Sequence, residues 1–147
     1  MPFNPKVDER VRASFARQPV MAMIGATLEA VRAGEVEVKL PFREALTQQH
    51  GFIHAGIIAA IADNACGYAA LSLMPDEAAV LTTEFKLNLL SPAKGDFLLA
   101  IGRVVRPGRK LIVCLGEVFS HEGDVPKQVA LMTASMMVVD THTGLRD

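Results

Sequence analysis

A single carboxylate lies inside a long apolar stretch of this chain. The segment from Gln48 to Leu73 reads QQHGFIHAGIIAAIADNACGYAALSL; Asp63 is its only acid, and it contains no Lys or Arg. Burying a carboxylate without a cation is unfavourable, and partial burial raises its pKa, which makes it a stronger base. Asp63 is therefore a candidate general base for taking a proton from water. A purely structural role stays equally open, in which Asp63 accepts a hydrogen bond from Thr82 or Tyr68.

The same stretch predicts a second chemical feature at the start of a helix. From Gly56 up to Pro75 the chain is apolar on every side apart from a short polar interruption, which is typical of a helix enclosed by other elements. The first N–H groups of a helix have no partner within it, so those of Ala55, Gly56 and Ile57 would point outward at the positive end of the helix dipole. Such donors suit a carbonyl oxygen that gains negative charge.

The distance between the helix start and Asp63 predicts that the two act in different active sites. Gly56 and Asp63 are seven residues apart, so they lie on nearly the same helix face, and the small side chains of Ala59 and Ala60 between them leave a groove for an acyl chain or thioester. Their separation is roughly 10 Å along the helix. One carbonyl cannot reach both, because each contact needs about 3 Å. A two-fold dimer that faces one helix start to the other chain's Asp63 would solve this, so we expect an active site shared between subunits.

Strand patterns occur on both sides of the central helix. Before it, Val36, Val38 and Leu40 alternate with charged residues, and a turn at 32–34 joins them to the run 26–31, which predicts a hairpin. After it come four long runs joined by short turns, which predict an antiparallel meander. These runs are residues 79–90, 97–105, 111–119 and 129–139.

Together these elements predict an α+β fold in a single domain over residues 1–147, with its core at about 26–140. A sheet of five to six antiparallel strands would curl round the long central helix. A shorter helix at about 8–18 precedes the core and stops before Pro19. The polar tail at 141–147 is expected to fray.

Composition narrows the classes of function. The chain is 50% hydrophobic and 21% charged with a net charge of -1, which is typical of a soluble globular protein. Its 15 Lys and Arg residues are balanced by 16 acids and form no aromatic-rich basic stretch, which argues against nucleic-acid binding. Asp63 and Asn64 would be costly in lipid, so we expect no membrane span.

The cysteines and the absence of two motifs exclude other chemistries. Cys66 and Cys114 lie in apolar segments far apart in sequence, which is typical of reduced core thiols in a cytoplasmic protein. The first residues lack the layout of an export signal. No pair of His, Cys or acidic residues stands at metal-ligand spacing, so no metal is expected. No G-x-S-x-G sequence occurs, which disfavours a serine hydrolase.

Three segments resemble a known family. GFIHAGIIAAIADNACGYAA, VLTTEFKLNLLSPAKGD and VVRPGRKLIVCLGEVF are similar to the hotdog-fold acyl-CoA thioesterases of the PaaI type, the phenylacetate-pathway thioesterase family. The likeness runs from Ala26 to Val139 and implies the hotdog fold. In that family G-x-x-H-G-G opens the central helix, and an Asp follows nine residues after the His. The corresponding residues here are Gly51, His54, Gly56 and Asp63.

The resemblance implies a role for each matching residue. Asp63 corresponds to the family's base or nucleophile, and the N–H of Ala55 corresponds to its oxyanion donor. His54 would help to hold the thioester, Gln48 stands for a polar amide that is often Asn, and Thr82 stands for a Ser or Thr that positions the attacking water. The first Gly of the family's H-G-G is Ala55 here. A positive φ at this position would strain an alanine, whereas we expect ordinary helix N-terminal geometry that keeps the N–H.

The resemblance also implies a substrate and partners. The expected reaction is hydrolysis of a fatty or arylacyl-CoA thioester to the free acid and coenzyme A, with no cofactor beyond the coenzyme A of the substrate. Arg109 and Lys110, in a basic turn, are the candidates for contacting its phosphates. We expect a homodimer with shared active sites that pairs further into a homotetramer. The alternative is a non-catalytic acyl-CoA binding module, and a hotdog dehydratase is disfavoured because its His and acid arrangement is not found.

Overall fold

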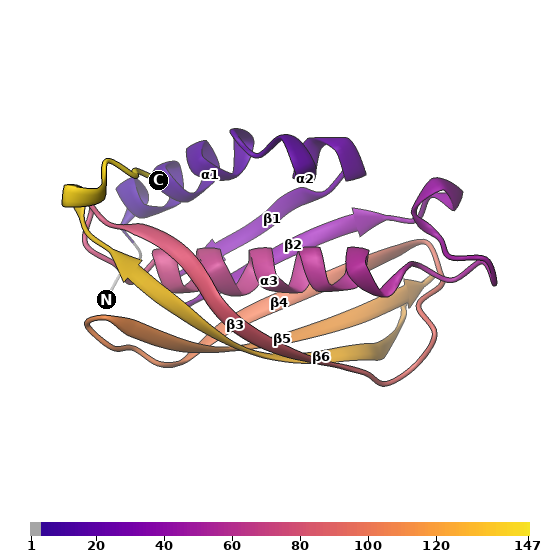
Figure 1. Cartoon of the computed structure of the whole chain (residues 1–147). Coiled ribbons are helices and arrows are strands. Elements are labelled where there is room, and N and C mark those ends of the chain that lie inside the picture. Colours follow the sequence, from indigo (N-terminus) through magenta and orange to yellow (C-terminus); the bar gives the residue numbers. More distant parts are fainter. Residues whose placement is uncertain (1–3) are drawn as a thin grey trace.

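The structure is a six-stranded antiparallel sheet that curls round one long helix. The computed structural model describes residues 4–147. Figure 1 shows helix α3, which spans Ala55–Leu71, lying across the concave face of the sheet. The strand order is β1-β2-β4-β5-β6-β3. This arrangement confirms the expected α+β hotdog fold and its curled sheet.

The strands lie where alternation placed them, but one pairing differs. The predicted hairpin is confirmed as β1 with β2. The predicted four-strand meander is wrong in one respect, because β3 pairs with β6 and not with β4. Alternation reports which residues face the core but not which strand lies alongside, and here residues 90–96 carry the chain from one edge of the sheet to its middle. The strands are β1 Thr27–Arg32, β2 Glu35–Pro41, β3 Ala79–Leu89, β4 Phe97–Arg106, β5 Leu111–Glu122 and β6 Val125–Val139.

Two helices precede the sheet where one was expected. Helix α1 spans Pro5–Ala16 and begins at Asn4, whose side chain accepts a backbone N–H in the first turn. The second helix, α2, spans Pro19–Ile24. The proline therefore starts a helix as well as separating it from α1, because a missing N–H costs nothing in the first turn.

Helix α3 lies very close to the sheet because of two glycines. Gly102 of β4 and Gly116 of β5 are paired across the strands. A Cβ atom at Gly102 would lie 2.3 Å from the backbone of Ala65, and one at Gly116 would lie 2.9 Å from the sulfur of Cys66. The cysteines Cys66 and Cys114 are buried and form no disulfide, and burial raises the pKa of the Cys114 thiol to about 12. The helix core is therefore closely packed and its thiols are protonated.

The C-terminal segment is docked on the domain, which corrects the expectation that it frays. A short 3-10 turn at Thr141–Thr143 follows β6. The carboxylate of Asp147 then accepts hydrogen bonds from the backbone N–H of Val80 at 2.6 Å and from the Ser14 hydroxyl at 3.1 Å. Composition alone missed this because a polar residue can be anchored by two specific bonds. Within residues 4–147, no helix has the length and apolarity needed to cross a membrane.

Candidate active site

The N-terminus of α3 is capped by a histidine. His54 has an extended backbone, with φ of -60° and ψ of 138°, and its Nδ1 accepts the N–H of Gly56 at 2.9 Å. The His54 carbonyl accepts the N–H of Ile57 at 2.9 Å. Two of the three N–H groups expected to be free are therefore occupied, one by the His54 side chain and one by the His54 carbonyl. Within residues 4–147, the N–H of Ala55 has no such acceptor.

The backbone geometry explains which glycines this segment needs. Gly51 has φ of +82°, a conformation that favours glycine. A Cβ atom at Gly56 would lie 3.2 Å from Nδ1 of His54, so a side chain there would crowd the cap. Ala55 needs neither property, since no residue other than glycine has a positive φ in the described part of the chain. The expectation that Ala55 has ordinary helical geometry is confirmed.

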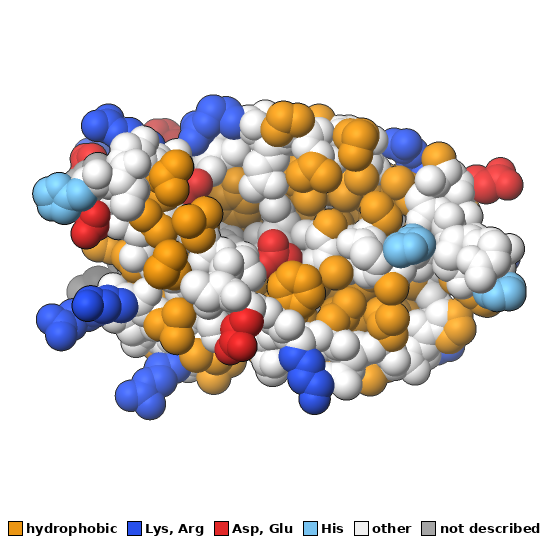
Figure 2. All heavy atoms as spheres, viewed as in Figure 1, with side chains coloured by type: hydrophobic (Ala, Val, Ile, Leu, Met, Phe, Trp, Pro, Cys, Tyr) orange, Lys and Arg blue, Asp and Glu red, His pale blue; other side chains and the backbone are white. Residues whose placement is uncertain are grey.

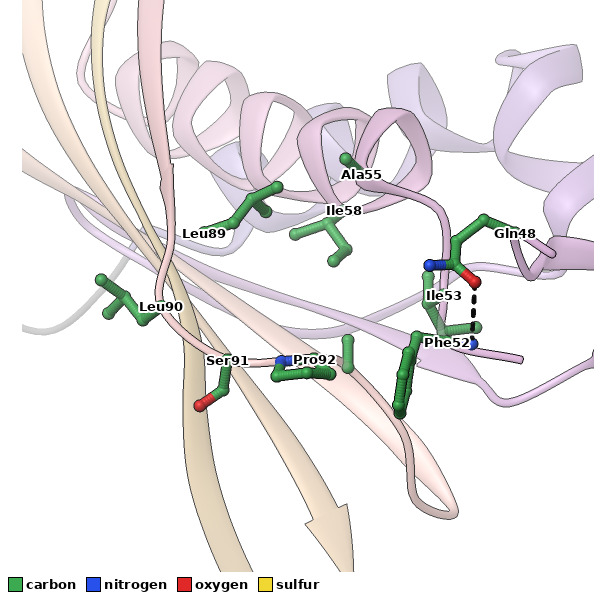
Figure 3. Close-up of a pocket in the computed structure, with 10 residues that line it drawn as sticks. Gln48, Phe52, Ile53, Ala55, Ile58, Leu89, Leu90, Ser91 and Pro92 are labelled. Carbon is green, nitrogen blue, oxygen red and sulfur yellow. Dashed lines mark hydrogen bonds between the residues drawn. The ribbon is translucent and has the colours of Figure 1, made fainter. Parts of the chain in front are cut away.

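Gln48 lies at the entrance to the helix start. Its side-chain oxygen accepts the N–H groups of His50 and Phe52, the latter at 3.4 Å, so the amide nitrogen is the end left for other contacts. Figure 3 shows that nitrogen directed away from Phe52. Gln48 and Ala55 border the same cavity, which has a volume of about 340 Å³. The other lining residues are mostly apolar: Phe52, Ile53, Ile58, Leu89, Leu90, Ser91, Pro92 and Ala93.

Asp63 lies on the same helix but borders a different cavity. The hydroxyl of Thr82, on edge strand β3, donates to Oδ1 of Asp63 at 2.7 Å. Burial raises the pKa of Asp63, and the Thr82 hydrogen bond opposes part of that rise. Within residues 4–147, Oδ2 of Asp63 has no hydrogen-bond donor. One oxygen is thus held by Thr82 while the other stays available to a water molecule.

A hydrogen-bonded chain forms the wall beside Asp63. Asn64 donates to Oε1 of Gln18 at 2.7 Å, Gln18 donates to the Tyr68 hydroxyl at 2.7 Å, and the Tyr68 and Ser14 hydroxyls lie 3.0 Å apart. Asp147 can only accept, so Ser14 donates to it, and Tyr68 must then donate to Ser14. Each hydroxyl in this series of hydrogen bonds therefore donates toward Asp147. This order also fixes the orientation of the Gln18 and Asn64 side-chain amides.

These wall residues were missed from the sequence. Gln18, Asn64, Tyr68 and Asp147 line a cavity of about 210 Å³ together with Asp63. Gln18 lies between α1 and α2, and its partner is 46 residues away, so no local pattern connects them. Asn64 is the one member with a signal, because a second polar residue in an apolar helix needs a hydrogen-bond partner. The sequence leaves Tyr68 open as a donor to Asp63, but its hydroxyl bonds to Ser14 and Gln18.

The two halves of the candidate site lie apart within one chain. Gln48 and Ala55 border the cavity at the helix start, whereas Asp63 and Thr82 border the other, and the two cavities share no lining residue. His54 is a capping residue next to the first cavity. One chain therefore supplies an N–H donor and a carboxylate to different places.

Arg109 and Lys110 lie at the opposite end of the sheet from Ala55. They occupy the turn between β4 and β5, where the Lys110 carbonyl accepts the N–H of Val138 at 2.9 Å. The helix start lies instead beside the connection from β3 to β4, to which Ile53 donates a hydrogen bond of 2.9 Å. Figure 1 shows these two turns at the two ends of the molecule. This pair could approach a substrate held at Ala55 only from another subunit.

Solved structures with the same fold include two that bear on this site. A thioesterase family protein of Silicibacter pomeroyi is 48% identical, covers 91% of this chain and 98% of its own, and superposes with a TM-score of 0.89. The E. coli PaaI protein from the phenylacetic acid degradation operon is 21% identical, with coverage of 93% and 96% and a TM-score of 0.81. At that identity, the PaaI comparison shows the shared fold.

Sequence comparisons agree with the structural ones. A curated protein of Halobacterium salinarum, provisionally named an esterase, is 35% identical over 94 residues. The match covers 60% of this chain and 62% of that protein, so it spans less than two thirds of the relative's length. Residues 50–127 match the family model of the thioesterase superfamily, and they include the capped helix start, Asp63 and Thr82. The chain belongs to the thioesterase superfamily.

Proposed function

We propose that this protein is an acyl-CoA thioesterase that hydrolyses a fatty or arylacyl-CoA thioester to the free acid and coenzyme A. The observation that carries this proposal is that one chain has both an unused N–H at Ala55 and a carboxylate, Asp63. One oxygen of that carboxylate is held by Thr82. An oxyanion donor and a base are the two groups that this hydrolysis needs. The family and its thioesterase relatives support the same reaction.

The active site in this proposal is shared between two subunits. Strand β3 is an edge strand, and its Leu81, Phe85 and Leu89 are exposed by 45%, 48% and 52%. Exposed apolar edges favour pairing with another strand. Figure 2 shows hydrophobic side chains gathered over α3 and β3 on this face. A second copy of the chain is therefore the partner that suits this edge.

Antiparallel pairing of two β3 strands would complete the site. Thr82, which holds Asp63, lies near the start of β3, and Leu89, which borders the Ala55 cavity, lies at its end. Pairing across a two-fold axis lays the start of one strand against the end of the other. Asp63 of one subunit would then approach the helix start of its partner. The half-buried small side chains of Ala59 and Ala60 on the same helix face permit that approach.

The chemistry follows from the roles of the two halves. The thioester carbonyl oxygen accepts the N–H of Ala55 and gains negative charge as the carbonyl is attacked. Asp63 takes a proton from the attacking water, or attacks the carbonyl itself to form an anhydride that water then hydrolyses. Collapse of the tetrahedral intermediate breaks the C–S bond, and coenzyme A leaves as a thiolate that is protonated. His54, whose Nδ1 is occupied by the cap, has Nε2 left to contact the thioester.

A binding module without turnover is the second candidate, because the hydrogen bond from Thr82 to Asp63 would serve a structural role equally well. A panel of short, long and aryl acyl-CoA thioesters, followed by thiol release, separates the two functions. Turnover of at least one substrate class supports the thioesterase. Binding of acyl-CoA with no thiol release from any member would favour the module.

A further inference from the structure

A second cavity continues from the one at the helix start. It has a volume of about 580 Å³, and Phe52 and Pro92 border both cavities. Figure 3 shows these two residues at the lower rim of the first cavity. The first cavity is mostly apolar, whereas the second also presents charged and hydroxyl groups. Its other lining residues are Lys94, Ser120, Glu122, Val125 and Lys127.

Two lysines and one acid line this second cavity. Lys94 comes from the β3–β4 connection and Lys127 from β6, so separate segments bring them to one place. Neither takes part in an ion pair among the described residues. Glu122 is the one acid in the lining, and it is exposed. The cavity therefore has an excess of positive charge that suits an anionic group.

Ser120 adds a hydroxyl donor to this cavity. The residue is only 6% exposed and borders the cavity, and its hydroxyl has no hydrogen-bond partner within residues 4–147. The other buried serines, Ser14 and Ser72, are both hydrogen bonded. A hydroxyl that borders a cavity and has no protein partner can donate to a ligand held there. Ser120 also lies directly opposite Lys127 in the β5–β6 ladder, so the two side chains share one face of the sheet.

We propose that this cavity binds the phosphate groups of coenzyme A. Lys94 and Lys127 pair with phosphate oxygens, and the Ser120 hydroxyl donates to one of them. The pantetheine arm passes Phe52 and Pro92 on its way from the thioester at the helix start. The inference rests on the proposed function, since it takes coenzyme A as the ligand. It assigns the phosphates to the subunit that supplies Ala55, rather than to the turn that contains Arg109 and Lys110.

Binding of free coenzyme A tests the site without requiring turnover. Calorimetric titration of the full chain would compare the parent with the double variant Lys94→Ala/Lys127→Ala. We expect about a tenfold or greater loss of affinity for coenzyme A, because charge-assisted hydrogen bonds are removed. The loss should be smaller for dephospho-coenzyme A, which has one phosphate fewer. Lys6→Ala/Arg17→Ala removes the same charge at the two ends of α1 and should leave affinity unchanged.

Two single variants should change the affinity for coenzyme A in opposite directions. Ser120→Ala should weaken binding of coenzyme A, because a phosphate oxygen loses its hydroxyl donor. Glu122→Gln should strengthen it, because the one negative charge in the lining is removed. Thermal unfolding of each variant would show that the fold is kept. Weaker binding of coenzyme A by Glu122→Gln than by the parent would count against the site.

The turn that contains Arg109 and Lys110 is the alternative site for the phosphates, and variants there can overturn the inference. If Arg109→Ala/Lys110→Ala loses affinity for coenzyme A while Lys94→Ala/Lys127→Ala keeps it, the phosphates bind at the other turn. Unchanged affinity in the lysine double variant, or no measurable binding by the parent at millimolar coenzyme A, would also reject the site. Loss of binding in that variant alongside a parent with no thioesterase activity would keep the site and reject the proposed function.

Discussion

The helix start and the surroundings of Asp63 are built in different ways. At the helix start the group available for chemistry is a backbone N–H, and the side chain at Ala55 contributes nothing to it. Asp63 instead depends on its own side chain, on Thr82 from a neighbouring strand, and on a wall completed by Gln18 and Asp147. The first region should therefore tolerate side-chain changes that keep the N–H. The second should not tolerate loss of its carboxylate.

The largest effect is expected at the carboxylate. Asp63→Asn keeps the shape of the side chain and removes the base, so kcat should fall by about 10²- to 10⁴-fold. Thiol release from the best acyl-CoA substrate would measure it. Glu84→Gln neutralises a different carboxylate, one on strand β3, and serves as the matched control, with little change expected. Turnover by Asp63→Asn equal to that of the parent would remove Asp63 from the mechanism.

The proposed oxyanion donor at the helix start can be removed by changing the backbone alone. Ala55→Pro removes the N–H at a position where proline is well tolerated, since it is the first helical residue and the preceding His54 is extended. We expect kcat to fall by about 10²- to 10³-fold with little change in melting temperature. Ala55→Gly keeps the N–H and should retain most of the activity. Similar losses in both variants would mean that the side chain matters, contrary to the contrast drawn above.

A smaller, pH-dependent effect is expected from Thr82→Val. Asp63 acts as a base only when ionised, so activity is lost on the acid side as pH falls through its pKa. Burial raises that pKa, and the Thr82 hydrogen bond lowers it. Removing the hydroxyl should therefore raise the pKa further and move the acid limb of kcat/KM to higher pH. An acid limb that stays in place, or moves down, would contradict this account of the carboxylate.

The smallest effect concerns the wall beside Asp63. Asp147→Ala removes two hydrogen-bond acceptors, for the Val80 N–H and the Ser14 hydroxyl, and should lower the free energy of unfolding by about 1 kcal/mol. Urea unfolding would measure the change. Asp124→Ala, in the exposed turn between β5 and β6, is the matched control. Equal stability of the two variants would mean that the C-terminal segment contributes nothing to the wall.

Much of the fold could be predicted from the sequence because its signals are local. Alternation at Val36, Val38 and Leu40 placed β2, and the apolar run after Gly56 placed α3. The partner of β3 could not be predicted in the same way. Alternation is the same whichever strand lies alongside, and only the path of residues 90–96 across the sheet separates β3 from β4.

The residues of the candidate site also differ in whether local sequence signals could indicate them. Asp63 was evident as an acid in an apolar helix, and resemblance to a family pointed to Thr82, which the structure places on Asp63. The hydrogen bond from the Gly56 N–H to the His54 side chain was not predicted. A polar residue two positions before a first-turn N–H is nevertheless a known helix cap. Gln18 could not be foreseen, because its contact with Asn64 forms only once α1 has packed on the domain.

Sharing of the active site between subunits is tested most directly by mixing two inactive variants. Ala55→Pro and Asp63→Asn chains, each with its own affinity tag, would be co-expressed and the doubly tagged dimers purified. In a shared site, one of the two sites of each mixed dimer has both an intact Ala55 N–H and an intact Asp63, so about half the parent activity per dimer should return. If Ala55 and Asp63 act within one chain, every site is defective, and the mixed dimers would be as inactive as either variant alone.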